Sequence, residues 1–201
     1  MIKTNTSEKG FQTDIINHLK STGYIRRTTN DYNVASCLDP ELTLKFIQNT
    51  QEKEWKKFQR VYGERTEEKF FKRLVLELQN KGTVHILRNG FKNAGVRFKL
   101  FFPKPNNNKN PDLFHKFYKN TFSVIDELEY QDKENSNRLD LVIFINGLPI
   151  LSIELKNTFS QGVENAIKQY REDRDSREQI FKRCPVHFAM SDEKNIHGHK
   201  A

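Results

Sequence analysis

Cysteine is scarce in this chain: its 201 residues include only Cys37 and Cys184, which form no C-x-x-C motif. Such isolated cysteines predict reduced thiols in a cytosolic protein. No apolar run approaches the length of a transmembrane span. No N-terminal segment combines a basic start, an apolar stretch and a small-residue cleavage site, so export is not expected. These absences favour a cytoplasmic location.

The sequence also lacks the phosphate-binding loop G-x-x-x-x-G-K-[ST] of ATP-driven motors. Gly90 and Gly95 have the spacing of its glycines, but Val96 and Arg97 follow them. The chain is therefore not expected to bind ATP or to act as a motor. We find no internal repeat, and the single low-complexity stretch, residues 103–111, predicts a polar surface loop.

The length of 201 residues fits one domain that is large enough to bury a core. The formal net charge is +8 and the pI is about 9.4. This excess of positive charge suits a polyanion such as DNA. Ordinary surface solubility explains the same charge, so composition alone does not choose between the two.

Local patterns predict an α/β fold. Asp39 and Pro40 have the order of a helix N-cap followed by proline at the first helical position, and Gly23 and Gly82 are expected to end helices. Helices are predicted over residues 8–20, 40–49, 51–61, 65–79 and about 163–170. Strands are predicted over residues 83–87, 96–102, 122–130 and 186–190, and residues 196–200 are predicted to be a frayed terminus despite their two histidines.

The most informative segment is residues 137–157, in which two apolar runs flank an Asn146-Gly147 turn. This pattern predicts a β-hairpin. Asp140, Glu154 and Lys156 stand at the ends of the runs, where burial is costly unless the charges are paired or bind a metal. Glu154 and Lys156 share one face of their strand. Together the three residues would form a compact site for a divalent cation and an attacking water.

The register of this hairpin tests that interpretation. A two-residue turn pairs Ile145 with Leu148 and, counted outward, Asp140 with Ile153, which leaves Glu154 on the wrong face. A longer turn or a β-bulge in either strand would bring Asp140 opposite Glu154. We therefore predict an irregular hairpin with an offset of one residue.

An Asp followed about a strand and a turn later by Glu-x-Lys resembles the PD-(D/E)XK nuclease motif. The surrounding text is Arg-x-Asp-Leu-Val-Ile-Phe-x-Asn-Gly-Leu-Pro-x-x-x-x-Glu-Leu-Lys-Asn, from Arg138 to Asn157. It strongly resembles the N-terminal nuclease domain of the restriction (R) subunit of type I restriction enzymes. The resemblance extends over residues 7–189 and implies a restriction-endonuclease-like α/β fold, with a central mixed β-sheet flanked by helices.

The resemblance also implies a metal-dependent DNA endonuclease with named site residues. Asp140, Glu154 and the Leu155 backbone carbonyl would hold Mg²⁺, with Mn²⁺ as a substitute. Lys156 would orient or help deprotonate the attacking water and stabilise charge on the phosphate. Two carboxylates without cysteine or paired histidines favour these ions over Zn²⁺.

Three further residues are candidates for supporting roles. Glu8 shares a helical face with apolar residues, which fits either a metal-facing acid or a first-turn Glu favoured by the helix dipole. Arg138 could reach a phosphate or form a plain salt bridge. Gln169 matches part of a Gln-x-x-x-Tyr pattern of related nucleases, but here Tyr170 is adjacent and is expected to pack in the core.

The R-subunit resemblance implies that residues 1–201 are a single nuclease domain, the N-terminal part of a longer bacterial or archaeal R subunit whose ATP-dependent translocase is not in this chain. The partners would be duplex DNA and the modification and specificity subunits of the complex. Two alternatives remain at this stage: a DNA-binding or docking module that no longer cuts, and an unrelated basic nucleic-acid binder.

Overall fold

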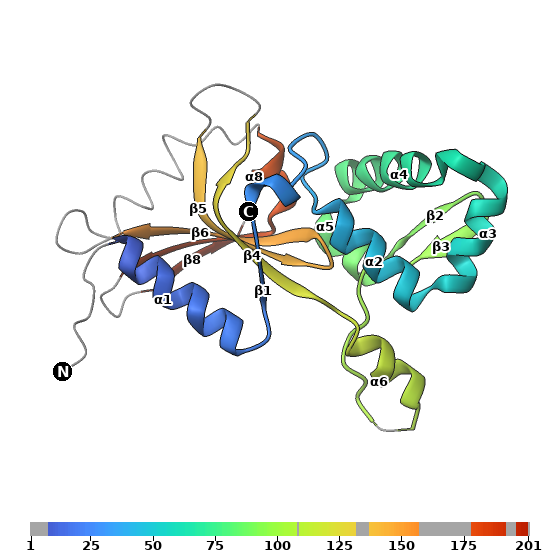
Figure 1. The fold of residues 1–201 in the computed structure, drawn as a ribbon, viewed down its shortest axis with the longest axis horizontal. Helices are drawn as coiled ribbons and strands as arrows, with labels where there is room; N and C mark the ends of the chain where they lie inside the picture. The colour runs from blue at the N-terminus through green and yellow to red at the C-terminus, as the bar shows by residue number, and fades with distance from the viewer. Residues whose placement is uncertain (1–7, 108, 132–136, 157–177, 192–195, 201) are drawn as a thin grey trace.

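The computed structural model describes residues 8–107, 109–131, 137–156, 178–191 and 196–200. These residues form one six-stranded mixed sheet, in the order β1-β4-β5-β6-β7-β8, and a separate two-stranded sheet, β2-β3 (Figure 1). The strands of the large sheet are β1 (Ile25–Arg27), β4 (Phe122–Glu129), β5 (Arg138–Ile145), β6 (Leu148–Lys156), β7 (Val186–Ser191) and β8 (Ile196–Lys200).

The centre of the large sheet is antiparallel and its flanks include parallel pairs. Strands β4, β5 and β6 pair antiparallel, whereas β1 runs parallel to β4 and β7 runs parallel to β6. Helices flank this sheet (Figure 1), so the predicted α/β class with a central mixed sheet is confirmed. The helices are α1 (Glu8–Ser21), α2 (Pro40–Thr50), α3 (Glu52–Tyr62), α4 (Thr66–Lys81), α5 (Thr83–Asn89), α6 (Pro111–Phe117) and α8 (Gln179–Arg183).

The predicted boundaries of the first four helices are confirmed to within about two residues. Asp39 caps α2 by accepting a hydrogen bond from the Leu42 N–H, and Pro40 occupies the first helical position, where no intrahelical donor is needed. Gly82 ends α4 with a φ of +77°, a conformation that glycine adopts at little steric cost.

The prediction of a strand over residues 83–87 is wrong, because these residues form helix α5. The run Thr-Val-His-Ile-Leu is apolar and β-branched, and a short run of this kind does not distinguish strand from buried helix. The burial spacing decides: Thr83 and Ile86 are buried, Val84 and His85 are exposed, and that interval of three is helical.

The strand predicted over residues 96–102 is shorter than expected. Strand β3 (Val96–Phe98) pairs only with β2 (Phe91–Asn93). At Lys99 a buried side chain replaces a neighbouring strand: Gln51 Oε1 accepts from the Lys99 N–H at 2.7 Å, and Gln51 Nε2 donates to the Lys99 carbonyl at 2.8 Å. The backbone is therefore satisfied without a longer ladder.

An aromatic core packs the lobe formed by α2–α5 and the β2–β3 hairpin. Phe58, Phe70 and Phe98 are fully buried and meet edge to face at centroid distances of 5.1–6.4 Å. Trp55 joins them edge-on to Phe70 at 5.5 Å. This geometry is the favoured one for aromatic pairs, and each ring removes a large apolar area from water.

Two smaller cores lie on the large sheet. One includes α1 and β6 residues such as Ile16, Ile153 and Leu155. The other includes α8 and both cysteines, which are buried and not joined in a disulfide. The sheet is thereby covered by apolar side chains on both faces, and this pattern of burial specifies the register of its strands.

The tip of the β5–β6 hairpin is anchored where the large sheet, which we call the sheet lobe, meets the lobe of α2–α5 and β2–β3. Asn146 and Gly147 have φ values of +50° and +80°, as a tight two-residue hairpin turn requires. The buried Asn146 side chain accepts from the Thr121 N–H at 2.7 Å and donates to the Leu100 carbonyl at 2.9 Å. A Cβ added at Gly147 would lie 2.2 Å from the Asp39 carbonyl oxygen, so only glycine fits there.

The prediction for residues 196–200 is also wrong, since they form strand β8, antiparallel to β7. The free edge of β7 supplies backbone partners that local sequence does not reveal. The helix predicted near residues 163–170 lies outside the described residues. Within the part of the chain that the structure describes, no helix is long and apolar enough to cross a membrane.

Candidate active site

The β5–β6 hairpin contains the predicted irregularity. Near the turn Ile145 pairs with Leu148, but farther out Leu141 pairs with Ile153, and the register shifts between Ile143 and Phe144. The extra residue is therefore Ile150 of β6. It follows Pro149, which has no N–H to donate to a ladder and is tolerated beside a bulge. The prediction of a one-residue offset is confirmed.

The offset places the two acids of the hairpin opposite each other. Continuing the outer register by one residue brings Asp140 opposite Glu154, on the face shared by the Val142–Ser152 pair. Without Ile150, the same count would bring Asp140 opposite Ile153. The bulge therefore sets which side chains meet at the open end of the hairpin.

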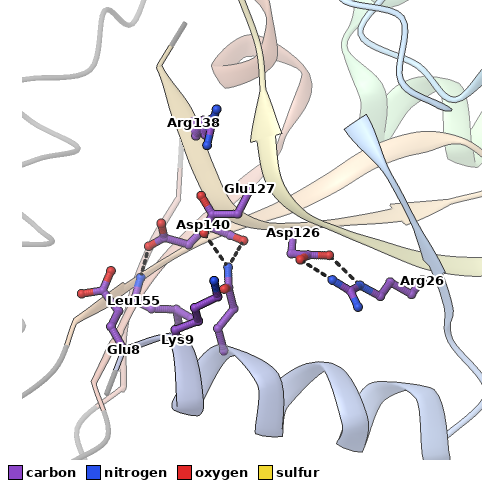
Figure 2. A pocket seen from close by; sticks show the side chains of 9 residues that line it. Glu8, Lys9, Arg26, Asp126, Glu127, Arg138, Asp140 and Leu155 are labelled. Atoms are coloured by element: carbon purple, nitrogen blue, oxygen red, sulfur yellow. Dashed lines mark hydrogen bonds and ion pairs between the residues drawn. The ribbon is translucent and has the colours of Figure 1, made fainter. Parts of the chain in front are cut away.

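Beyond Leu141 and Ile153 the Asp140 side chain replaces the backbone ladder. The Leu155 N–H donates to Asp140 Oδ2 at 2.6 Å (Figure 2). The N–H and C=O of one residue in a strand point toward the same neighbour. The Leu155 carbonyl oxygen is accordingly directed toward the β5 side, where Asp140 lies.

A cavity of about 530 Å³ opens at this end of the hairpin. Its lining comes from α1, β1, β4, β5 and β6, so residues far apart in the chain meet there (Figure 2). The described residues that line it are Glu8, Lys9, Gln12, Arg26, Asp126, Glu127, Arg138, Asp140 and Leu155.

Glu8 lies among the predicted site residues. Burial raises the pKa of its carboxyl group, the nearby Lys156 ammonium lowers the pKa, and the negative charges of Asp140 and Glu127 raise it. The net effect is an increase. Glu8 therefore interacts electrostatically with both Lys156 and Asp140, although it also occupies the first turn of α1.

Gln12 and Glu127 are site residues that sequence reasoning missed. Gln12 Nε2 donates to the Asp140 carbonyl at 2.8 Å and to Glu127 Oε1 at 3.1 Å. Glu127 has a φ of +50° inside β4, a strained conformation for a residue with a side chain, and such strain concentrates at functional sites. The Asp126-Glu127 pair within an apolar strand was the available signal.

Two arginines at the cavity are already paired. Arg26 binds Asp126 through two hydrogen bonds of 2.8 and 2.7 Å. Arg138 lies 2.7 Å from Glu129 in a partly exposed ion pair. The salt-bridge alternative for Arg138 is therefore present, while its position in the cavity lining leaves it within reach of a ligand.

Glu154 occupies a different position from the other acids. Its side chain is 1% exposed, and it is not among the described residues that line the cavity. Glu154 pairs with Ala189 of β7, and Lys156 pairs with Ser191 two residues farther along. The structure thus brings Asp140, Leu155 and Glu8 together in the cavity lining, whereas Lys156 and the buried Glu154 are not among the described residues that line it. Gln169 and Tyr170 lie outside the described residues.

The donor set determines which metal ion the site would fit. The described lining contains carboxylates and a backbone amide unit but neither cysteine nor histidine, and such hard oxygen donors suit Mg²⁺ or Mn²⁺. Among the described residues, no group of three or more His, Cys, Asp and Glu is placed to hold a metal. Two carboxylates, one backbone carbonyl and several waters are nevertheless sufficient ligands to coordinate Mg²⁺. The residues therefore fit this ion.

A mixed sheet flanked by helices, with a bulged hairpin that places Asp140 opposite Glu154, defines a fold of the PD-(D/E)XK nuclease type. The family described as "Type I restriction enzyme R protein N terminus" matches residues 5–200. The chain belongs to this family. A comparison with curated proteins gives no match.

Proposed function

We propose that this chain is the metal-dependent DNA endonuclease domain of a type I restriction complex. It would hydrolyse phosphodiester bonds of foreign duplex DNA in the cytoplasm of a bacterium or archaeon. Membership of the R-protein family supports the restriction system. The observation that carries the cleavage chemistry is the offset at Ile150, because it brings Asp140 opposite Glu154.

The chemistry assigns a role to each residue at the open end of the hairpin. Asp140, Glu154 and the Leu155 carbonyl would hold Mg²⁺, which when bound supplies charge neutralisation at the phosphate and a more acidic water. The Lys156 ammonium orients the attacking water and offsets negative charge that grows on the phosphate oxygens. Gln12 positions Asp140 through its main-chain carbonyl.

The proposal divides the work of restriction between this domain and its partners. The proposal gives this domain the cleavage residues, and sequence choice would belong to the specificity subunit. An ATP-driven translocase in the full R subunit would deliver the DNA. Cleavage by the isolated chain is therefore expected to be slow, indifferent to sequence and independent of ATP.

A plasmid-nicking assay tests the proposal directly. Supercoiled plasmids of unrelated sequence are incubated with the chain in Mg²⁺, in Mn²⁺, in chelator, and in Mg²⁺ with ATP. Nicking is expected in both metals alone and is expected to stop in chelator. ATP stimulation, or cutting at one fixed site, would contradict the division of work described above.

Two matched variants separate the site from general surface charge. Asp140→Asn is expected to abolish nicking and to weaken Mn²⁺ binding in calorimetry. Asp14→Asn makes the same chemical change at an exposed position of α1 and is expected to behave as the native chain. If the native chain binds DNA but cuts in neither metal, the alternative of a non-cutting DNA-binding or docking module replaces the endonuclease proposal.

A further inference from the structure

The net positive charge of the chain comes from one segment. Residues 81–119 contain nine Lys and Arg against a single acid, Asp112, a net charge of +8 that equals the formal net charge of the whole chain. The remaining residues are balanced. The nine cations are Lys81, Arg88, Lys92, Arg97, Lys99, Lys104, Lys109, Lys116 and Lys119.

The β2–β3 hairpin arranges part of this charge on one face. Lys92 and Arg97 are direct cross-strand partners, and Lys99 follows two residues after Arg97, so strand alternation puts it on the same side. All three side chains are exposed. We call the set Lys92, Arg97 and Lys99 the hairpin face.

The arrangement has an electrostatic cost that the described residues do not offset. Like charges directly opposite each other destabilise an antiparallel pair. Of the nine cations only Lys81 forms an ion pair with a described residue, Glu77. Lys92, Arg97 and Lys99 form none in the part of the chain that the structure describes. An anion bound from outside would relieve this repulsion.

The hairpin face rests on a rigid support. Phe91 and Phe98, on the opposite side of the two strands, are buried in the aromatic core and pair across the hairpin. Gln51 holds both backbone groups of Lys99. Gly90 allows the close approach of the strands, because a Cβ there would lie 2.0 Å from the Phe98 carbonyl oxygen. The backbone positions of the cations are therefore fixed.

The hairpin face is distant from the candidate active site. The cavity lies among α1, β1, β4, β5 and β6, whereas β2 and β3 lie at the other end of the long axis, beside α3 and α4 (Figure 1). None of the three cations lines the cavity. A ligand of the hairpin face would therefore be bound away from the cleavage residues.

We propose that the hairpin face is a contact surface for the phosphate backbone of duplex DNA, separate from the cavity. Fixed cations at neighbouring strand positions suit a regular array of phosphates, and phosphate contacts position a duplex without reading its sequence. The surface adds binding to the proposed nuclease and is independent of whether the chain cuts.

The test measures binding in chelator, where cleavage is not involved. The triple variant Lys92→Gln/Arg97→Gln/Lys99→Gln is titrated with a labelled duplex by fluorescence anisotropy across a salt series. Loss of three phosphate contacts is expected to weaken binding about tenfold or more and to make the log–log salt slope shallower by about 2 to 3. The conservative pair Lys92→Arg/Lys99→Arg is expected to retain affinity and slope.

A control removes the same charge elsewhere. Lys20→Gln/Lys45→Gln/Lys182→Gln neutralises exposed lysines on α1, α2 and α8, and a fall in affinity of about twofold is expected from the long-range charge alone. Equal effects of the two triple variants, or native binding by the hairpin-face variant, would overturn the proposal. A lowered thermal midpoint with an unchanged salt slope would do so too. If the native chain never nicks plasmid but the hairpin-face variant still loses DNA, the cleavage proposal fails and this one stands.

Discussion

The two lobes of the molecule use their interiors in opposite ways. In the lobe of α2–α5 and β2–β3, the core cluster is aromatic and apolar, the buried Glu77 of α4 is paired with the more exposed Arg73 and Lys81, and the charged groups of the hairpin face point outward. In the sheet lobe, charged groups extend into the structure: Glu154 is almost fully buried, and Asp140 replaces a backbone partner of Leu155. The aromatic interior makes its lobe rigid. In the sheet lobe, regular backbone pairing is lost at the open end of the β5–β6 hairpin, where the candidate site is assembled.

This difference predicts how each lobe responds to mutation. Removing a ring from the aromatic core should lower stability without changing the chemistry, because no aromatic core residue is among the described residues that line the cavity. Removing a charged group at the open end of the hairpin should change the chemistry with little loss of stability. A core variant that lost activity but kept its stability, or a hairpin variant that lost stability but kept its activity, would remove the distinction between the lobes.

The largest effect is expected for Lys156→Ala. Its ammonium is proposed to act mainly in the transition state, so nicking should fall about 10³-fold, or about 4 kcal/mol, while folding and most DNA binding remain. The measurement is single-turnover nicking beside DNA titration, with the exposed Lys182→Ala as control. Near-native cutting by Lys156→Ala would assign this lysine to a surface role.

The next effect is expected for Phe58→Ala in the aromatic lobe. Phe58 is fully buried against Phe70 and Phe98, and truncation of such a ring costs about 3 to 5 kcal/mol. Urea unfolding measures the loss, and the nicking rate per folded molecule should be unchanged. Phe114→Ala, on the short helix α6, should cost much less because that ring is only partly buried.

Much of the fold could be predicted because local chemistry determined it. Asp39 and Pro40 marked the start of α2, and glycine marked the end of α4. Strand β3 could not be predicted correctly, because it ends where Gln51, 48 residues away in sequence, takes both backbone groups of Lys99. Strand β8 likewise depends on the edge of β7. Long-range partners leave no local pattern.

A smaller effect is expected for Asn146→Ala at the junction of the lobes. The variant loses the side-chain partners at Thr121, Leu100 and Asn120, and alanine tolerates the φ of +50° less well than asparagine. Loss of buried hydrogen bonds and added strain should together cost about 2 kcal/mol. Urea unfolding tests this against Asn106→Ala, which changes an exposed loop residue. Equal stabilities would show that the junction does not depend on this side chain.

The smallest effect is expected for Gln12→Ala. It removes the donor to Glu127 and to the Asp140 carbonyl but no group proposed to touch DNA or metal. Stability should fall by about 1 kcal/mol, and nicking should slow by less than in Lys156→Ala. Thr13→Ala, exposed on the same helix, is the control. Loss of nicking as complete as in Lys156→Ala would move Gln12 into the chemistry itself.

The candidate site was predictable in part for the same physical reason. Asp140, Glu154 and Lys156 were predictable because each is a charged residue at the end of an apolar run. The alternation of side chains along strands then requires the offset that the hairpin contains. Gln12 carries no such mark, and the only local signal for Glu127 is the Asp126-Glu127 pair within an apolar strand. Gln12 reaches the site because α1 packs against β6, and the left-handed conformation of Glu127 is visible only in three dimensions.

The bulge at Ile150 also limits how this hairpin can change in length. Its tip is immobilised, since Gly147 fits directly against Asp39, and its far end carries Glu154 and Lys156. Between these fixed points, adding or deleting one residue turns both side chains to the other face, whereas a change of two residues restores them. In relatives that keep the site, the length of this segment should therefore differ only by even numbers of residues. Insertions or deletions of a single residue should be eliminated during evolution.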